Sequence, residues 1–98
     1  MKKSAFDIKE QSWLARIASK KLHSQKVAMV LGKTIHLHNT TREEFLKDEK
    51  WVKHELCHLD QFRRHGYIGF TLMYLWESVR KGYYNNRFEV EARNAEHL

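Results

Sequence analysis

Residues 50–65 read KWVKHELCHLDQFRRH, and this stretch decides the fold because it predicts the helix on which the rest of the chain packs. At about 100° per residue, its apolar side chains fall within one arc of the helical wheel, and two histidines and a glutamate continue that arc on one side. Gly66 follows, at the position that favours a left-handed C-terminal cap. We therefore expect a central helix that ends at His65. Its apolar arc consists of Val52, Leu56, Leu59 and Phe62.

The segments before this helix predict a first helix, a β-hairpin and a short capped helix. Apolar residues recur every three to five positions over residues 7–21, which indicates an amphipathic helix. Residues 27–38 are rich in Val, Ile, Leu and Thr around Gly32-Lys33, and they predict a hairpin as the only sheet material. Thr41 and Glu44 have the spacing of a capping box, so a short helix is expected to begin there and to end near residue 48.

Two further helices are expected after Gly66. Residues 67–81 carry a narrow apolar stripe and predict a core helix that stops at Gly82. The stretch is too short to cross a bilayer core of about 30 Å, and Glu77 interrupts it, so no membrane span is expected. A last helix begins near Arg87. The sequence therefore predicts an α+β fold with one short hairpin and four or five helices. The stripe consists of Ile68, Leu72, Leu75, Trp76 and Val79.

The bulk composition is that of one folded domain covering residues 1–98. The net charge is +6, but the basic residues are spread thinly and form no RNA-recognition motif, which argues against a nucleic-acid partner. Cys57 is the single cysteine, so no intramolecular disulfide can form. The Met1-Lys2-Lys3 start leads into polar residues and not into the apolar segment of a signal peptide. A cytoplasmic location is expected.

The chemistry of the sequence is concentrated in His54-Glu55-Leu56-Cys57-His58. Histidines four residues apart lie on neighbouring turns of one helix face, where both imidazoles can reach a common metal ion. Glu55 is rotated about 100° from His54, so it stands beside the metal and can accept a proton from a metal-bound water. This HExxH spacing recurs in zinc hydrolases. A catalytic zinc needs a third protein ligand, and the last helix offers Glu89 and Glu91, between which the helical wheel does not decide.

Residues 54–58, followed by a helix with Glu-x-x-Ala at residues 89–92, resemble the gluzincin branch of the HExxH zinc metallopeptidases. The resemblance implies a small zincin-like domain in which His54, His58 and Glu89 bind Zn²⁺. It also implies that Glu55 is the catalytic base that activates water. The function that follows from the resemblance is zinc-dependent hydrolysis of a peptide or protein substrate.

Two departures from the gluzincin pattern matter. Arg93 stands where an Asp usually follows Glu-x-x-Ala, so a carboxylate that orients a ligand histidine has to come from another residue. The chain is also too short for the second subdomain that walls the cleft in larger members, which favours small or extended peptides as substrates. Two other interpretations stay open: a zinc-binding or peptide-binding domain without turnover, and a basic nucleic-acid module without metal.

The remaining candidate residues are expected to play no part in catalysis. Cys57 points about 100° away from His58, toward the polar side of the helix. His36 and His38 share one face of a strand and could contact a second metal, but such a pair is expected to be exposed. Tyr83 or Tyr84 could donate to a developing oxyanion, although packing of these rings against Trp76 is slightly preferred.

Overall fold

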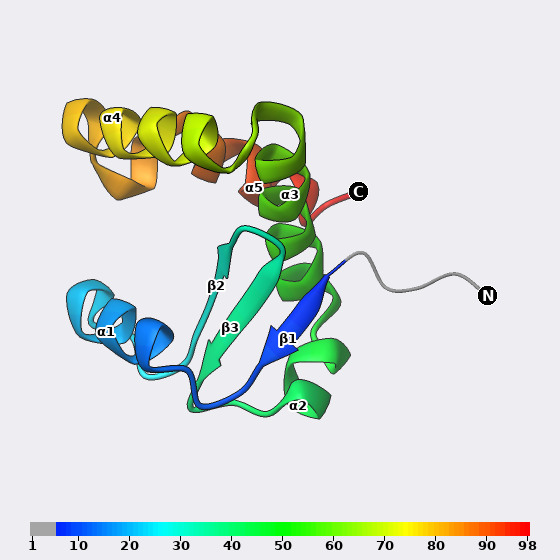
Figure 1. Cartoon of the computed structure of the whole chain (residues 1–98). Helices are drawn as coiled ribbons and strands as arrows, with labels where there is room; N and C mark the ends of the chain where they lie inside the picture. The colour runs from blue at the N-terminus through cyan, green and yellow to red at the C-terminus, as the bar shows by residue number, and fades with distance from the viewer. Residues whose placement is uncertain (1–5) are drawn as a thin grey trace.

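The computed structural model describes residues 6–98 and has the predicted α+β fold, with five helices and a three-stranded sheet in this range (Figure 1). The first three residues, on which the expected lack of a signal peptide rests, lie outside it. The order is β1 (Asp7–Lys9), α1 (Trp13–Leu22), β2 (Val27–Leu31), β3 (Thr34–His38), α2 (Arg42–Lys47), α3 (Glu49–His65), α4 (Tyr67–Asn85) and α5 (Arg87–Ala95).

The sheet has the order β1-β3-β2 and is mixed. Strands β2 and β3 form the predicted antiparallel hairpin, and Gly32 takes the positive φ of 67° that its turn requires. Strand β1 pairs with β3 in parallel, so the hairpin is not the only sheet material and the prediction of a helix over residues 7–21 is wrong at its start. Ser12 caps α1 by accepting a hydrogen bond from the Ala15 amide, and the helix begins only at Trp13.

The turns around α2 and α3 follow from local side-chain chemistry. The capping box is confirmed: Thr41 Oγ1 accepts from the Glu44 amide at 3.1 Å, and Glu44 Oε1 accepts from the Thr41 amide at 3.1 Å. Asp48 caps α3 through the Trp51 amide at 3.1 Å. Gly66 has the expected positive φ of 80°, but its ψ of 158° is extended, so the left-handed helical cap was predicted wrongly. The chain therefore turns directly into α4.

Helix α3 is central, as predicted, because both core clusters form against it. Ile35 and Leu37 of β3 pack with Phe45 of α2, and Trp51, Val52 and Leu59 of α3 lie against them. The second cluster joins Phe62 of α3 to Phe70 of α4 and Phe88 of α5. Helices α4 and α5 are thus fixed on α3 by aromatic contacts, and α5 runs beside α3 (Figure 1).

Helix α4 packs by a different face from the one predicted. Its buried residues are Phe70 and Glu77, whereas the side chains of the predicted core stripe are exposed. Gly82 breaks the helix with φ 82° and ψ 166°, which agrees with the predicted stop. None of the helices within residues 6–98 has both the length and the apolar character needed to cross a membrane.

Candidate metal centre

Helices α3 and α5 bring together two imidazoles and a carboxylate. His54 and His58 lie on successive turns of α3, with ring centroids 5.0 Å apart. Glu89, in the first turn of α5, faces both rings. One ligand atom from each of the three residues lies within 4.8 Å of the others, which is a spacing that allows a shared metal ion.

The structure separates the two glutamates that the helical wheel left equivalent. Glu89 is buried, and its Oε1 and Oε2 lie 3.1 Å from His54 Nε2 and 3.2 Å from His58 Nε2. Glu91 is exposed and accepts hydrogen bonds from Arg64 Nη2 at 3.1 Å and Gln61 Nε2 at 2.8 Å. The rotation of α5 on α3 therefore turns Glu89, and not Glu91, toward the histidine pair.

A hydrogen bond on the outer nitrogen holds each imidazole in place. His54 Nδ1 lies 2.7 Å from Glu96 Oε2, and His58 Nδ1 lies 2.8 Å from Gln61 Oε1. Donation from Nδ1 leaves Nε2 of each neutral ring free to bind a metal. Glu96 thus supplies the orienting carboxylate that Arg93 does not provide. It was missed in the sequence, although it lies seven residues after Glu89 and therefore on the same face of the chain's last helical turns.

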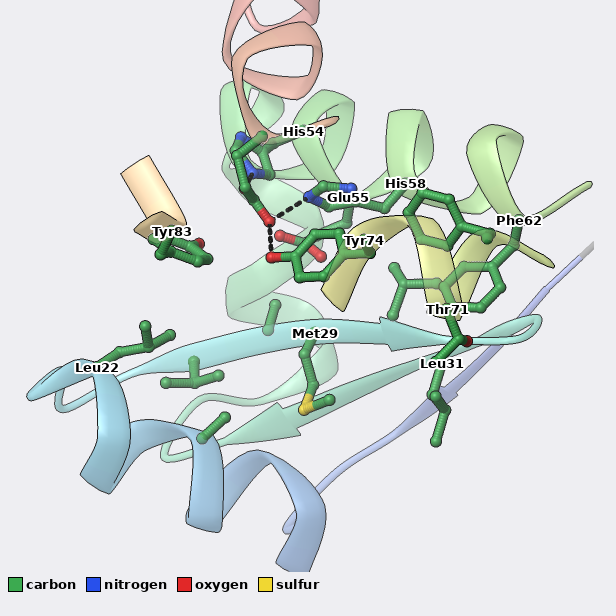
Figure 2. A pocket seen from close by; sticks show the side chains of 16 residues that line it. Leu22, Met29, Leu31, His54, Glu55, His58, Phe62, Thr71, Tyr74 and Tyr83 are labelled. Atoms are coloured by element: carbon green, nitrogen blue, oxygen red, sulfur yellow. Dashed lines mark hydrogen bonds and ion pairs between the residues drawn. The ribbon is translucent and has the colours of Figure 1, made fainter. Parts of the chain in front are cut away.

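Tyr74 is a further residue of the site that sequence reasoning missed. It comes from α4, and its hydroxyl donates to Glu89 Oε2 at 2.5 Å. Burial and the nearby Glu89 carboxylate raise the pKa of Tyr74, so the hydroxyl stays protonated and keeps its donor role. Figure 2 shows Tyr74 and Glu55 pointing into the same space as the two imidazoles. The only local sign in the sequence is that Tyr74 follows Phe70 by four residues, on the face of α4 that packs inward.

The charges of the cluster favour a cation at its centre. Burial alone would raise the pKa of Glu89, but the hydrogen bonds from His54, His58 and Tyr74 outweigh it and lower that pKa. Burial likewise opposes charge on both imidazoles, yet their contacts with Glu89 raise the pKa of each. When no metal is bound, these contacts favour protons on His54 and His58 beside Glu89. Binding a metal ion displaces them.

Glu55 is the buried carboxylate next to this cluster. Its side chain is 4% exposed, and Oε1 has no hydrogen-bond partner within residues 6–98. Burial, followed by the repulsion of Glu89 and Glu96, raises the pKa of Glu55 to about 8 despite the attraction of His58. A buried polar oxygen without a partner is costly and uncommon in folded proteins. Its position therefore calls for a functional explanation.

We expect Glu55 to make the metal-free fold less stable as the pH rises. Because its pKa is raised on folding, its contribution to stability is fully present below the unfolded value of 4.5 and is lost as the pH rises toward about 8. Glu55→Gln removes this titration, so the stability of the natural chain relative to Glu55→Gln should fall by roughly 3 to 4 kcal/mol between pH 5 and pH 8. Urea unfolding of chelator-treated protein at both values measures it. Equal pH dependence in the two proteins would show that Glu55 does not titrate in this way.

A cavity of ≈ 210 Å³ opens beside the cluster. Its floor is β2, all five of whose residues line it, and its walls include residues of α3 and α4 (Figure 2). Tyr83 lies at this cavity with its pKa raised by burial and by Glu89, whereas the Tyr84 ring lies 3.9 Å from the Arg93 guanidinium. Of the two tyrosines, Tyr83 is therefore the one placed beside the candidate site.

The other predicted candidates lie outside the cluster. Cys57 is half-buried, and its Sγ accepts from Gln61 Nε2 at 3.6 Å. Burial raises the pKa of the Cys57 thiol to about 11, which disfavours the thiolate that binds metals. His36 was expected to be exposed but is buried, with its Nδ1 2.8 Å from Ser12 Oγ. His36 therefore ties β3 to the start of α1. Sequence spacing alone could not indicate this contact, because Ser12 and His36 lie far apart in the chain.

The chain was compared with protein-family models, curated proteins and solved structures, and nothing matches it. Function has to be argued from the geometry of the cluster and its cavity.

Proposed function

We propose that this protein is a zinc-dependent hydrolase of the metallopeptidase type, in which His54, His58 and Glu89 hold the metal and Glu55 is the general base. The observation that carries the proposal is the convergence of three ligand atoms within 4.8 Å, contributed by two helices, with His58 and Glu89 buried and His54 partly buried. Each ligand side chain is in addition oriented by another residue, namely Glu96, Gln61 or Tyr74. Such outer partners are typical of metal sites in proteins.

The donor set suits zinc. Two imidazole nitrogens and one carboxylate oxygen form the three-ligand set of catalytic zinc sites, which leave a fourth position open. Glu55, whose Oε1 has no hydrogen-bond partner within residues 6–98, lines the cavity beside the same cluster. When bound, zinc supplies Lewis acidity, which polarises a carbonyl and lowers the pKa of water to about 7. All other contributions come from the side chains of the chain itself.

Glu55 is suited to move the proton. Burial raises the pKa of Glu55 in the metal-free chain, so its carboxylate is a stronger base than that of an exposed glutamate, which suits a group that takes a proton from water and returns it to a leaving amine. Its raised pKa comes mainly from burial, so access of bulk water to it is limited. Tyr83, at the same cavity, can donate a hydrogen bond to negative charge that develops on a substrate oxygen.

The cavity suits an extended peptide. Strand β2 is an edge of the sheet, and one side of it pairs with no other strand of residues 6–98, so a further strand could be added there. A peptide bound in this way runs past the imidazole pair, since His54 and His58 line the same cavity as Val27–Leu31. The substrate class that follows is an unfolded or extended polypeptide segment.

Metal analysis tests the proposal most directly. Protein purified without chelator is expected to contain zinc at about one ion per chain, and to hydrolyse an unstructured peptide. Chelation should abolish hydrolysis and leave the helical circular-dichroism signal intact, and added zinc should restore activity. If removal of the metal unfolds the chain, the zinc is structural and not catalytic. Metal content near zero would refute the metal site altogether.

A further inference from the structure

Helix α4 carries an uncovered apolar face. Five large side chains, spaced at helical intervals over residues 68–79, are between 55% and 80% exposed. They lie opposite Phe70 and Glu77, the two residues by which α4 is buried, so no element within residues 6–98 covers them. We call these side chains the outer face of α4: Ile68, Leu72, Leu75, Trp76 and Val79.

The outer face includes one tryptophan. Trp76 is 62% exposed and lies among the aliphatic side chains of the face. Tryptophan and tyrosine are enriched where a protein meets the headgroup region of a bilayer. Clusters of leucine, isoleucine and tryptophan along one side of a helix are typical of segments that lie in the plane of a membrane.

The charge around the outer face is basic. Between residues 67 and 86 the only acidic residue is Glu77, whose carboxylate is buried on the inner side and accepts from the Arg87 amide at 3.1 Å. Arg80 follows the stripe directly, and its guanidinium lies 6.0 Å from the Trp76 ring centroid. Lys81 is turned to the inner side, where its Nζ lies 3.5 Å from Glu77 Oε1. The outer face therefore offers apolar surface and positive charge with no exposed carboxylate.

From these observations we infer that the outer face of α4 docks on an anionic membrane surface. Its length, about 16 Å at 1.5 Å per residue, suits a helix that lies along the surface with its apolar side chains among the lipid headgroups and upper acyl chains. Arg80 then contacts anionic headgroups. A second copy of this chain fits less well, because each copy carries a net charge of +6 and would place its basic residues against those of the other.

Docking in this way would hold the candidate site close to the bilayer. Thr71 and Tyr74 line the cavity, and Thr71 is adjacent to Leu72 on the helix, about 100° away around its axis. Residues that line the cavity are therefore next to the face that meets the lipid. Membrane docking does not depend on the peptidase proposal, since it requires neither zinc nor Glu55.

Co-sedimentation with vesicles tests the inference. The full chain is mixed with vesicles of phosphatidylcholine alone or of equal parts phosphatidylcholine and phosphatidylglycerol. We expect binding to the anionic vesicles, and a loss of about tenfold or more in the partition coefficient for Leu72→Glu/Val79→Glu. Arg80→Gln should lower binding to anionic vesicles by about fivefold and leave the weak binding to neutral vesicles unchanged.

Leu46→Glu is the matched control, because Leu46 is a similarly exposed apolar residue on α2. It should bind vesicles as the natural chain does, and circular dichroism should show the same helix content in all variants. Equal vesicle binding by Leu72→Glu/Val79→Glu and the natural chain would overturn the inference. A second pattern would also overturn it: the natural chain does not bind vesicles, forms dimers without lipid in sedimentation velocity, and loses these dimers in Leu72→Glu/Val79→Glu. The outer face would then join two copies of the chain.

Discussion

Glu55→Gln is expected to lower the turnover of peptide hydrolysis by about a thousandfold and to leave the zinc content unchanged. Glutamine has almost the same shape as glutamate but cannot accept the proton that the reaction releases. Zinc should stay because Glu55 is not one of the three residues whose ligand atoms lie within 4.8 Å of one another. The measurement is kcat with an unstructured peptide, together with metal analysis of the same preparations.

Asp60→Asn is the control for this change. Asp60 is also an acidic residue of α3, but its carboxylate is partly exposed and pairs with Arg63 and Arg64 away from the cavity. Its amide variant should keep both zinc and activity. If Glu55→Gln retains full turnover, Glu55 is not the base, and its buried carboxylate needs another explanation. If it loses zinc as well, Glu55 contributes to holding the metal.

Helix α3 and the hairpin could be predicted because their determinants are local. The apolar arc of α3, the Thr41 capping box and Gly32 at the hairpin turn all act within a few residues of the chain. Strand β1 was missed because its partner Thr34–His38 lies far along the sequence. The spacing of Ile8 to Trp13 resembled a helix, but Ile8 packs against the cluster under the sheet.

Helix α4 shows what periodicity cannot decide. The stripe was visible in the sequence, but a pattern of apolar residues does not say which face of a helix meets the core. The face that packs combines Phe70 with the polar Glu77, whose carboxylate accepts from the start of α5. A stripe that the fold leaves uncovered is therefore a feature of function to be explained.

The candidate site likewise has one part that could be predicted from the sequence and another that could not. His54, Glu55 and His58 were predicted because one helix fixes their relative positions. The choice of Glu89 over Glu91 depends on how α5 rotates against α3, and that rotation is set by Phe88 and Ala92, which are buried in the contact. The supporting contacts from Tyr74, Gln61 and Glu96 could not be found in advance, since each depends on tertiary packing.

Glu89→Ala is expected to weaken zinc binding by about 100-fold or more, whereas Glu91→Ala should change it by less than about threefold. The two residues have the same chemistry and lie two positions apart on one helix. Only Glu89 is buried against both imidazoles, and the carboxylate of Glu91 is engaged by Arg64 and Gln61. Competition with a zinc-binding dye gives both affinities.

Glu96→Gln is expected to weaken zinc binding by an amount between those of Glu89→Ala and Glu91→Ala. Its carboxylate touches His54 Nδ1 and not the point where the three ligand atoms converge, so its loss should weaken zinc binding by about tenfold to 100-fold. The order Glu89, then Glu96, then Glu91 therefore tests the geometry of the site as a whole. A stronger loss from Glu91→Ala than from Glu89→Ala would require α5 to turn by about 200° around its axis, which would expose Phe88 and contradict the packing that defines the site.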